Sequence, residues 1–200
     1  MRFYMPNTTQ NKTKYKLTDE EVIRRFQAGD EAAFEELVHR YANRLMNFAY
    51  RFVLDRQEAE DIVQDTFLKV YQNRHAYREI AKFSTWIYTI TANLAKTILR
   101  KRRNRKLFYF SRLGPEDHEV DFPSQDTPPG ERVEGQFSEQ MIQKAIEKLP
   151  EHFRTAIILR DIQDLSYEEI SNIVGAPLGT VKSRINRARL RLQEELKQLK

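Results

Sequence analysis

The chain has 200 residues, with 34 Lys or Arg, 29 Asp or Glu and a net charge of +5. It contains no cysteine and only four scattered histidines, which excludes disulfides, thiolate metal sites and cysteine catalysis and argues against a histidine metal site. No apolar run approaches the roughly 18 residues of a membrane span, and the N-terminus lacks the apolar segment of a secretory signal, so we expect a cytoplasmic protein.

The first part of the chain is predicted to be helical. Residues 1–17 are polar and lack periodicity, so we interpret them as a mobile tail. From residue 18 to residue 110, apolar residues recur at the three- and four-residue steps of four amphipathic helices. Each helix is preceded by a residue that favours a helix N-terminus. These predicted caps are Thr18, Asp30, Asp55 and Ser84.

The third predicted helix has an apolar stripe and an acidic face with one exposed leucine. This face consists of Glu60, Asp61, Gln64, Asp65 and Leu68. Dense carboxylates occur in metal sites and acid/base pairs, but no histidine or Gly-rich loop accompanies these. A solvated face is the simpler interpretation, and docking onto a basic partner helix also fits. We predict no catalytic residue, no metal and no cofactor.

A polar loop and the fourth helix form a basic region. The loop, 75–83, carries Tyr77 and Lys82, and the helix ends with six bases in residues 100–106. A solvated helix end is the simple interpretation, but so many bases favour phosphate binding, and neighbouring aromatic residues suit stacking on unpaired bases. The polar side of the helix also carries Trp86, Asn93, Lys96, Arg100 and Arg103.

Residues 111–137 are rich in Pro, Gly and acidic residues, which predicts a linker. The charge distribution supports a division here: residues 1–110 carry a net charge of +8, residues 111–138 a net −5, and residues 139–200 a net +2. Two basic blocks separated by an acidic strip suggest two anion-binding modules on a tether.

Residues 138–200 are predicted to form four helices that end in a helix-turn-helix. Ser166 and Glu169 form a capping box, and the helix they begin stops at Gly175. The last helix places Val181, Ile185, Ala188 and Leu192 on one apolar stripe. Its opposite face carries Lys182, Ser183, Asn186 and Arg187, a composition suited to phosphates and base edges.

Several of these segments resemble motifs of one known family. In the first unit they are Glu58-Ala59-Glu60-Asp61-x-x-Gln64-Asp65-x-Phe67 and Phe83-Ser84-Thr85-Trp86-Ile87-Tyr88-x-Ile90-x-x-Asn93. In the second they are Leu149-Pro150-x-x-x-Arg154, Leu165-Ser166-Tyr167-Glu168-Glu169-Ile170 and Pro177-x-Gly179-Thr180-Val181-Lys182-Ser183-Arg184. In content and order they resemble bacterial RNA polymerase sigma factors of the extracytoplasmic-function type, group 4 of the sigma-70 family.

The resemblance implies an all-α fold of two small helical domains joined by the acidic linker. Residues 18–110 would form the region 2-like domain, which binds the polymerase core and the −10 element. Residues 138–200 would form the region 4-like four-helix domain, a helix-turn-helix that binds the −35 element. It also implies a sigma factor that directs RNA polymerase to promoters and helps to melt the −10 element, without enzymatic activity of its own.

The resemblance further implies a role for each candidate residue. Residues Glu60, Asp61, Gln64, Asp65 and Leu68 would dock on the clamp coiled coil of the largest polymerase subunit, and region 4 would contact the flap. The −10 candidates are Tyr77, Lys82, Trp86, Asn93, Lys96, Arg100 and Arg103. The −35 candidates are Thr180, Lys182, Ser183, Arg184, Asn186 and Arg187. An anti-sigma factor is the expected regulatory partner.

Two other classes of protein are the alternatives. A stand-alone helix-turn-helix regulator would bind duplex DNA as a dimer, although no dimerisation segment or ligand domain is evident. An enzyme acting through the carboxylates of residues 58–65 would require a partner base, a phosphate loop and a third ligand, and the sequence offers none of these.

Overall fold

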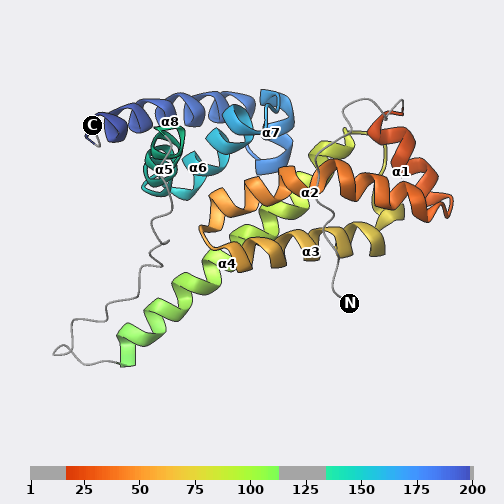
Figure 1. The fold of residues 1–200 in the computed structure, drawn as a ribbon, viewed down its shortest axis with the longest axis horizontal. Helices are drawn as coiled ribbons and strands as arrows, with labels where there is room; N and C mark the ends of the chain where they lie inside the picture. Colours follow the sequence, from red (N-terminus) through yellow and green to blue (C-terminus); the bar gives the residue numbers. More distant parts are fainter. Residues whose placement is uncertain (1–16, 113–133, 199–200) are drawn as a thin grey trace.

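The computed structural model describes residues 17–112 and 134–198, and within these ranges all regular structure is helical. Figure 1 shows the helices in chain order. They are α1 (Asp19–Gln27), α2 (Glu31–Val53), α3 (Arg56–Gln72), the 3-10 turn η1 (Arg74–Ala76), α4 (Phe83–Arg112), α5 (Glu134–Glu147), α6 (Glu151–Ile157), the π-helical turn η2 (Ile158–Ile162), α7 (Tyr167–Val174) and α8 (Leu178–Gln198). The predicted tail, except residue 17, and most of the predicted linker lie outside the described residues.

Three of the predicted caps in the first unit are present. The backbone N–H of Glu21 donates to Thr18 Oγ1 at 3.2 Å and that of Thr18 donates to Glu21 Oε2 at 2.7 Å, which completes the capping box of α1. Asp30 and Asp55 accept from backbone N–H groups in the first turns of α2 and α3. Each carboxylate or hydroxyl satisfies a donor that the helix itself leaves unpaired.

The predicted cap of α4 is wrong. The helix begins at Phe83, two residues before the start that a Ser84 cap would give, and the Phe83 N–H donates to Glu20 Oε1 at 3.0 Å. A carboxylate on α1 therefore satisfies the N-terminus of α4, and it also complements the positive end of the helix dipole. Ser84 lies in the first turn and is free to bond elsewhere.

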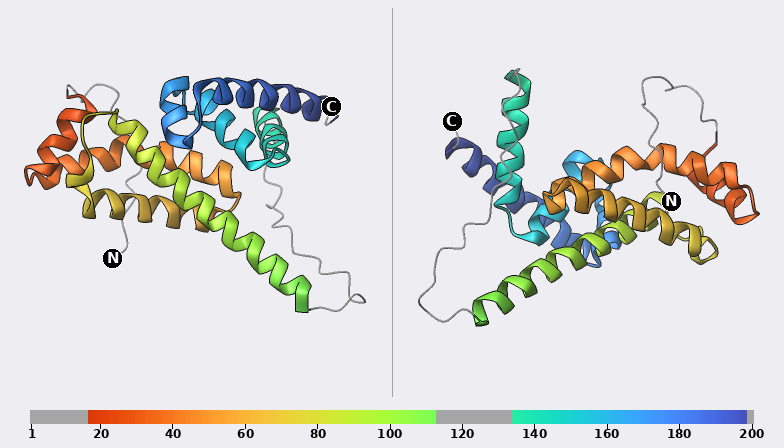
Figure 2. Two further views of the ribbon diagram at one scale, coloured as in Figure 1. Left: turned by 180° about the vertical axis from the view of Figure 1, so that it is seen from behind. Right: turned by 60° about the horizontal axis from the view of Figure 1, so that its bottom comes forward.

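Helices α1 to α4 pack around one apolar core. The bulky residues at its centre are fully buried: Phe26, Leu37, Tyr41, Leu45, Phe48, Phe52, Ile62, Phe83, Ile87 and Tyr88. The C-terminal half of α4 extends beyond α2 and α3, as both views in Figure 2 show. In this half, residues 100–105 are exposed apart from the half-buried Arg102.

Helices α5 to α8 form the second unit, and one predicted helix in it is interrupted. Residues 152–161 were expected to form a single helix, but after Ile157 the backbone widens into η2, where the N–H of Gln163 donates to the carbonyl of Ile158 at 3.0 Å. Asp164 follows with a left-handed φ of 60°. Such turns are uncommon and often mark functional positions.

The two units pack against each other and share a contiguous set of buried apolar residues. Helix α7 lies along α4, while α5 and η2 contact α2. The sequence separates the units by a predicted linker, but it contains no indication of this contact.

Candidate nucleic-acid interface

The helix-turn-helix consists of α7, a tight turn and α8. Gly175 ends α7 in the left-handed conformation with φ 63°, where its N–H donates to the carbonyl of Ser171. The Ser171 hydroxyl donates to the carbonyl of Ala176 at 2.6 Å, which closes the turn. Glycine suits this position because a Cβ is strained at positive φ. The turn sets the direction in which α8 leaves the unit.

Helix α8 buries its predicted apolar stripe and exposes its polar face. Val181, Ile185 and Ala188 are buried, and they anchor the helix to α6 and α7. The exposed residues of the opposite face are Lys182, Ser183, Asn186 and Arg187, with Thr180 and Arg184 half-buried at its margin. The face is accessible to a DNA major groove, although the Ser183 hydroxyl donates to the Thr180 carbonyl at 2.9 Å and Lys182 Nζ lies 5.7 Å from the centre of the Tyr167 ring.

Two of the bases in α8 serve the unit itself. Arg189 pairs with Asp161 at 2.6 Å, and the Arg191 guanidinium lies 5.1 Å from the centre of the Phe153 ring. Asp161 raises the pKa of Arg189 chiefly through a hydrogen bond. Arg189 and Arg191, in the middle of α8, are therefore exposed but contact η2 and α6 of their own unit.

Helix α4 carries a second exposed polar strip. Asn93, Arg100 and Arg103 are exposed, and Lys96 is half-buried. Arg102, within the same basic run, has a different environment: it pairs with Glu58 at 2.6 Å and donates to the carbonyl of Val53 at 2.7 Å. Arg102 thus joins the C-terminus of α2 to the start of α3, while its neighbours face solvent.

The loop before α4 differs from the sequence-based picture. Tyr77 is only 5% exposed, packs against Phe83 and Trp86, and donates its hydroxyl to the carbonyl of Ala81 at 2.9 Å. Its ring is therefore not available for stacking in this conformation, and Trp86 is half-buried against the same cluster. Instead, Ile80 is 88% exposed at the loop surface. In the sequence, Ile80 could have been noticed only as an apolar residue within a polar loop.

The acidic face of α3 lies on the surface. Asp61, Gln64 and Asp65 are exposed, and Leu68 is 52% exposed. Glu60 is half-buried and pairs with Arg56 at 3.0 Å. Within the described residues, no group of three or more His, Asp or Glu side chains could hold a metal ion. The face is therefore an exposed acidic surface with one exposed leucine.

Comparison with known proteins agrees with these features. The model of sigma-70 region 2 matches residues 22–105, and that of sigma-70 region 4 matches residues 139–192. The chain belongs to the sigma-70 family. Among curated relatives of this sigma factor, the extracytoplasmic-function sigma-E factor of Haemophilus influenzae is 36% identical over 92% of this chain and 98% of its own. RNA polymerase sigma-H factor of Pseudomonas aeruginosa is 37% identical over 90% of this chain and 95% of its own.

Solved structures agree with the fold of the sigma factor. The sigma factor RpoE of Bartonella quintana, determined in complex with the anti-sigma factor NepR, is 31% identical, with a TM-score of 0.64 over 82% of this chain and 96% of its own. CnrH, determined with the cytosolic domain of CnrY, matches with a TM-score of 0.66 over 90% of this chain and 97% of its own at 23% identity, which supports the fold alone. The family is non-enzymatic and directs RNA polymerase to promoters. Across the described ranges, no helix of this sigma factor has the length and apolarity to cross a bilayer.

The contact between the two regions of the sigma factor involves residues that sequence analysis did not single out. Gln163, buried after η2, accepts from the Tyr88 hydroxyl of α4 at 2.5 Å and donates to Asn47 Oδ1 of α2 at 3.4 Å. Burial raises the pKa of Tyr88 to about 12, so its hydroxyl keeps its proton and remains a donor. No local pattern marks Gln163, because its partners are distant in the chain.

Proposed function

We propose that this chain is an extracytoplasmic-function sigma factor that docks on the polymerase clamp through α3, captures the −10 strand with α4 and the loop before it, and reads the −35 element with α8. The observation that carries the proposal is the presence of both regions in one chain, each exposing the polar face that its family role requires. A stand-alone regulator would not need the acidic surface of α3.

For the −35 element, we propose that Lys182, Ser183, Asn186 and Arg187 enter the major groove, with Thr180 and Arg184 at the edge of the contact. Each good bidentate contact to a base contributes about 1–3 kcal/mol of discrimination. The half-buried position of Thr180 and Arg184 suits phosphate contacts that orient the helix.

For the −10 element, we propose that Asn93, Lys96, Arg100 and Arg103 hold the strand and that Lys82 contacts its backbone. Ile80, rather than Tyr77 or Trp86, contacts an unstacked base in this proposal, because Ile80 offers an exposed apolar surface. Tyr77 and Trp86 pack against each other and support the loop. Unstacking a base costs a few kcal/mol, which contacts of this kind offset.

For the polymerase, we propose that Asp61, Gln64, Asp65 and Leu68 form the centre of the docking surface and that Glu60 lies at its edge. Complementary charge guides and orients such contacts, and desolvation of Leu68 adds apolar burial. Region 4 is proposed to contact the flap. An anti-sigma factor is the proposed regulator, supported by the complex of the Bartonella quintana relative with NepR.

Run-off transcription with purified core polymerase on a library of genomic promoters tests the function as a whole. We expect specific transcripts that depend on added protein and that share −35 and −10 sequences. A chain that binds palindromic duplex DNA tightly without polymerase, and gives no transcripts with it, would instead be a stand-alone regulator.

A charge reversal tests the docking surface. Asp65→Lys should weaken binding to core polymerase at least about tenfold, because like charges at an interface cost several kcal/mol. Glu35→Lys makes the same charge change at an exposed position on α2 and should leave binding unchanged. Equal binding by both variants in co-elution or biolayer interferometry would refute docking through α3. A pulldown from native cells that recovers polymerase but never a small second protein would count against the anti-sigma partner.

A further inference from the structure

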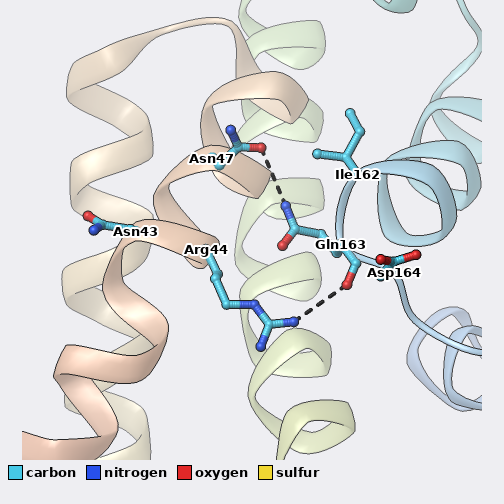
Figure 3. Close-up of a pocket in the computed structure, with 6 residues that line it drawn as sticks. All are labelled: Asn43, Arg44, Asn47, Ile162, Gln163 and Asp164. Carbon is cyan, nitrogen blue, oxygen red and sulfur yellow. Dashed lines mark hydrogen bonds between the residues drawn. The ribbon is translucent and has the colours of Figure 1, made fainter. Parts of the chain in front are cut away.

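Region 2 and region 4 meet at an interface in the free chain. Figure 3 shows Gln163 projecting from the end of η2 toward α2, where Asn47 and Arg44 bond its side-chain nitrogen and backbone carbonyl. These residues, with Asn43, Ile162 and Asp164, line an open cleft of about 440 Å³. Gln163 is 6% exposed and its bond to Tyr88 is buried, whereas Arg44 and Asn47 are exposed, so the interdomain hydrogen-bond network runs from a buried centre to the surface of the cleft.

The backbone around Gln163 is irregular in a way that serves this network. The π-helical turn interrupts the helix predicted for residues 152–161, and the left-handed Asp164 follows the turn. The turn also carries two buried residues, Ile158 and Leu159, which pack into the apolar core. The irregular turn aims Gln163 at α2 and α4, which belong to the other region.

A second contact, at the C-terminal end of α2, joins the same two regions. Arg154 of α6 donates to the carbonyl of Phe52 at the end of α2 at 3.0 Å and to the carbonyl of Leu149 at 3.2 Å. One guanidinium therefore satisfies carbonyls at the C-terminal ends of helices from both regions, where cations are favoured. Arg51 of α2 donates to Gln143 of α5 at 3.0 Å along the same side.

A third contact involves a residue proposed to bind DNA. Lys82, in the loop before α4, pairs with Glu169 of α7 at 3.2 Å, and the Ser84 hydroxyl donates to the same carboxylate at 3.4 Å. Glu169 also completes the capping box of α7, with its other oxygen accepting from the Ser166 N–H at 2.8 Å. Burial raises the pKa of Glu169, but the hydrogen bonds from Ser166 and Lys82 outweigh it and hold the pKa below its ordinary value. The carboxylate is thus ionised at neutral pH.

We propose that these contacts form a latch that holds the free sigma factor closed, with the Glu169 carboxylate occupying the position on Lys82 that a −10 phosphate takes in the open complex. The latch rests on the proposed function of Lys82. The acidic face of α3 and the polar face of α8 stay exposed in the closed chain, so polymerase and the −35 element can bind before it opens. Binding of the −10 strand then competes directly with Glu169.

Distance measurements test the closed state in the full chain. Because the chain has no cysteine, spin labels can be attached at Glu35→Cys on α2 and Gln193→Cys on α8, both exposed positions. Pulsed electron paramagnetic resonance should give one narrow distance. Tyr88→Phe keeps the buried ring but removes the donor to Gln163, and it should raise the ratio of open to closed chain about fivefold. A broad distribution in the parent chain, or no change in the variant, would overturn the latch.

DNA binding tests the role of Glu169. Glu169→Gln keeps the capping box, since glutamine serves at that position, but removes the charge that pairs with Lys82. It should bind a fluorescein-labelled, random-sequence single-stranded DNA of about 12 nucleotides roughly two- to fivefold more tightly, because a larger fraction of the chain is competent. Glu21→Gln is the matched control: it makes the same change at the same position of the α1 capping box, where the neighbouring cation is Arg24 of the same helix.

The outcomes separate this inference from the proposed function. Equal affinity of the parent chain, Glu169→Gln and Glu21→Gln would overturn competition at Lys82, even if run-off transcription succeeds. Tighter binding by both variants would also overturn it, since any lost carboxylate would then suffice. A narrow distance distribution in the parent chain, together with tighter DNA binding by Glu169→Gln but not by Glu21→Gln, supports the latch. Failure of run-off transcription in the same preparation would count against the proposed function alone.

Discussion

Two adjacent arginines on α4 should behave in opposite ways when each is replaced. Arg102 is held by Glu58 at 2.6 Å and by the carbonyl of Val53 at 2.7 Å, whereas Arg103 is exposed. Arg102→Met should reduce the free energy of unfolding, because it removes a hydrogen bond at the end of α2 and leaves the half-buried Glu58 carboxylate without its cation. Arg103→Met should leave stability unchanged and weaken promoter binding.

The size of the stability loss in Arg102→Met depends on how exposed the Arg102–Glu58 pair is. The Arg102 side chain is 36% exposed and that of Glu58 30%, so solvent screens part of the pairing. The interaction is intermediate between a screened surface ion pair and a hydrogen bond to a charged group, so the expected loss in the free energy of unfolding is about 1–2 kcal/mol. For a cooperative unit of this size, that loss lowers Tm by about 2–8 °C. Arg103→Met should instead reduce by about one the slope of log binding constant against log salt concentration.

Thermal unfolding followed by circular dichroism measures the first effect, and promoter binding of the holoenzyme over a salt series measures the second. The reasoning would be refuted if Arg103→Met lowered Tm as much as Arg102→Met. It would also be refuted if Arg102→Met retained the parent Tm and instead lost a phosphate contact.

Three further predictions concern the helix-turn-helix. Ile185→Ala should cost about 2–4 kcal/mol in denaturant unfolding, since Ile185 is fully buried, whereas Leu190→Ala, at a residue 57% exposed, should cost little. Gly175→Ala should cost about 1 kcal/mol from backbone strain at φ 63° alone, because the added Cβ meets no atom of a residue beyond its chain neighbours within 4 Å; a much larger loss of the free energy of unfolding would contradict this. Asn186→Ala should leave Tm unchanged but weaken binding to the −35 element by about 1–3 kcal/mol in competition assays with mutated sites.

Much of the fold was predictable because its causes are local. Capping residues lie within three positions of the N–H groups they accept from, and apolar stripes repeat every three or four residues, so the helix starts at Thr18, Asp30 and Asp55 and the buried face of α8 could be inferred directly. The order of motifs indicated the family. The polar face of α8 and the acidic face of α3 lie largely on the surface, as the periodicity predicted.

Other features depended on packing between segments that are distant in the chain. Tyr77 was expected to stack on bases, but Phe83 and Trp86 enclose it, while Ile80 took the exposed position. Ser84 was expected to cap α4, but Glu20 supplies the acceptor from 63 residues away. In both cases the local sequence pattern was compatible with the prediction, but contacts with residues elsewhere in the fold gave a different arrangement.

The sequence by itself determined which segments are helices, which faces are apolar and which family the motifs resemble, because these depend on composition and spacing within a few turns. Only the tertiary structure decided that Arg102 braces α2 while Arg103 faces solvent, and that Gln163 meets Tyr88 across 75 residues of chain. A side chain's role depends on what packs against it, and packing partners drawn from different helices leave no periodic signal in the sequence.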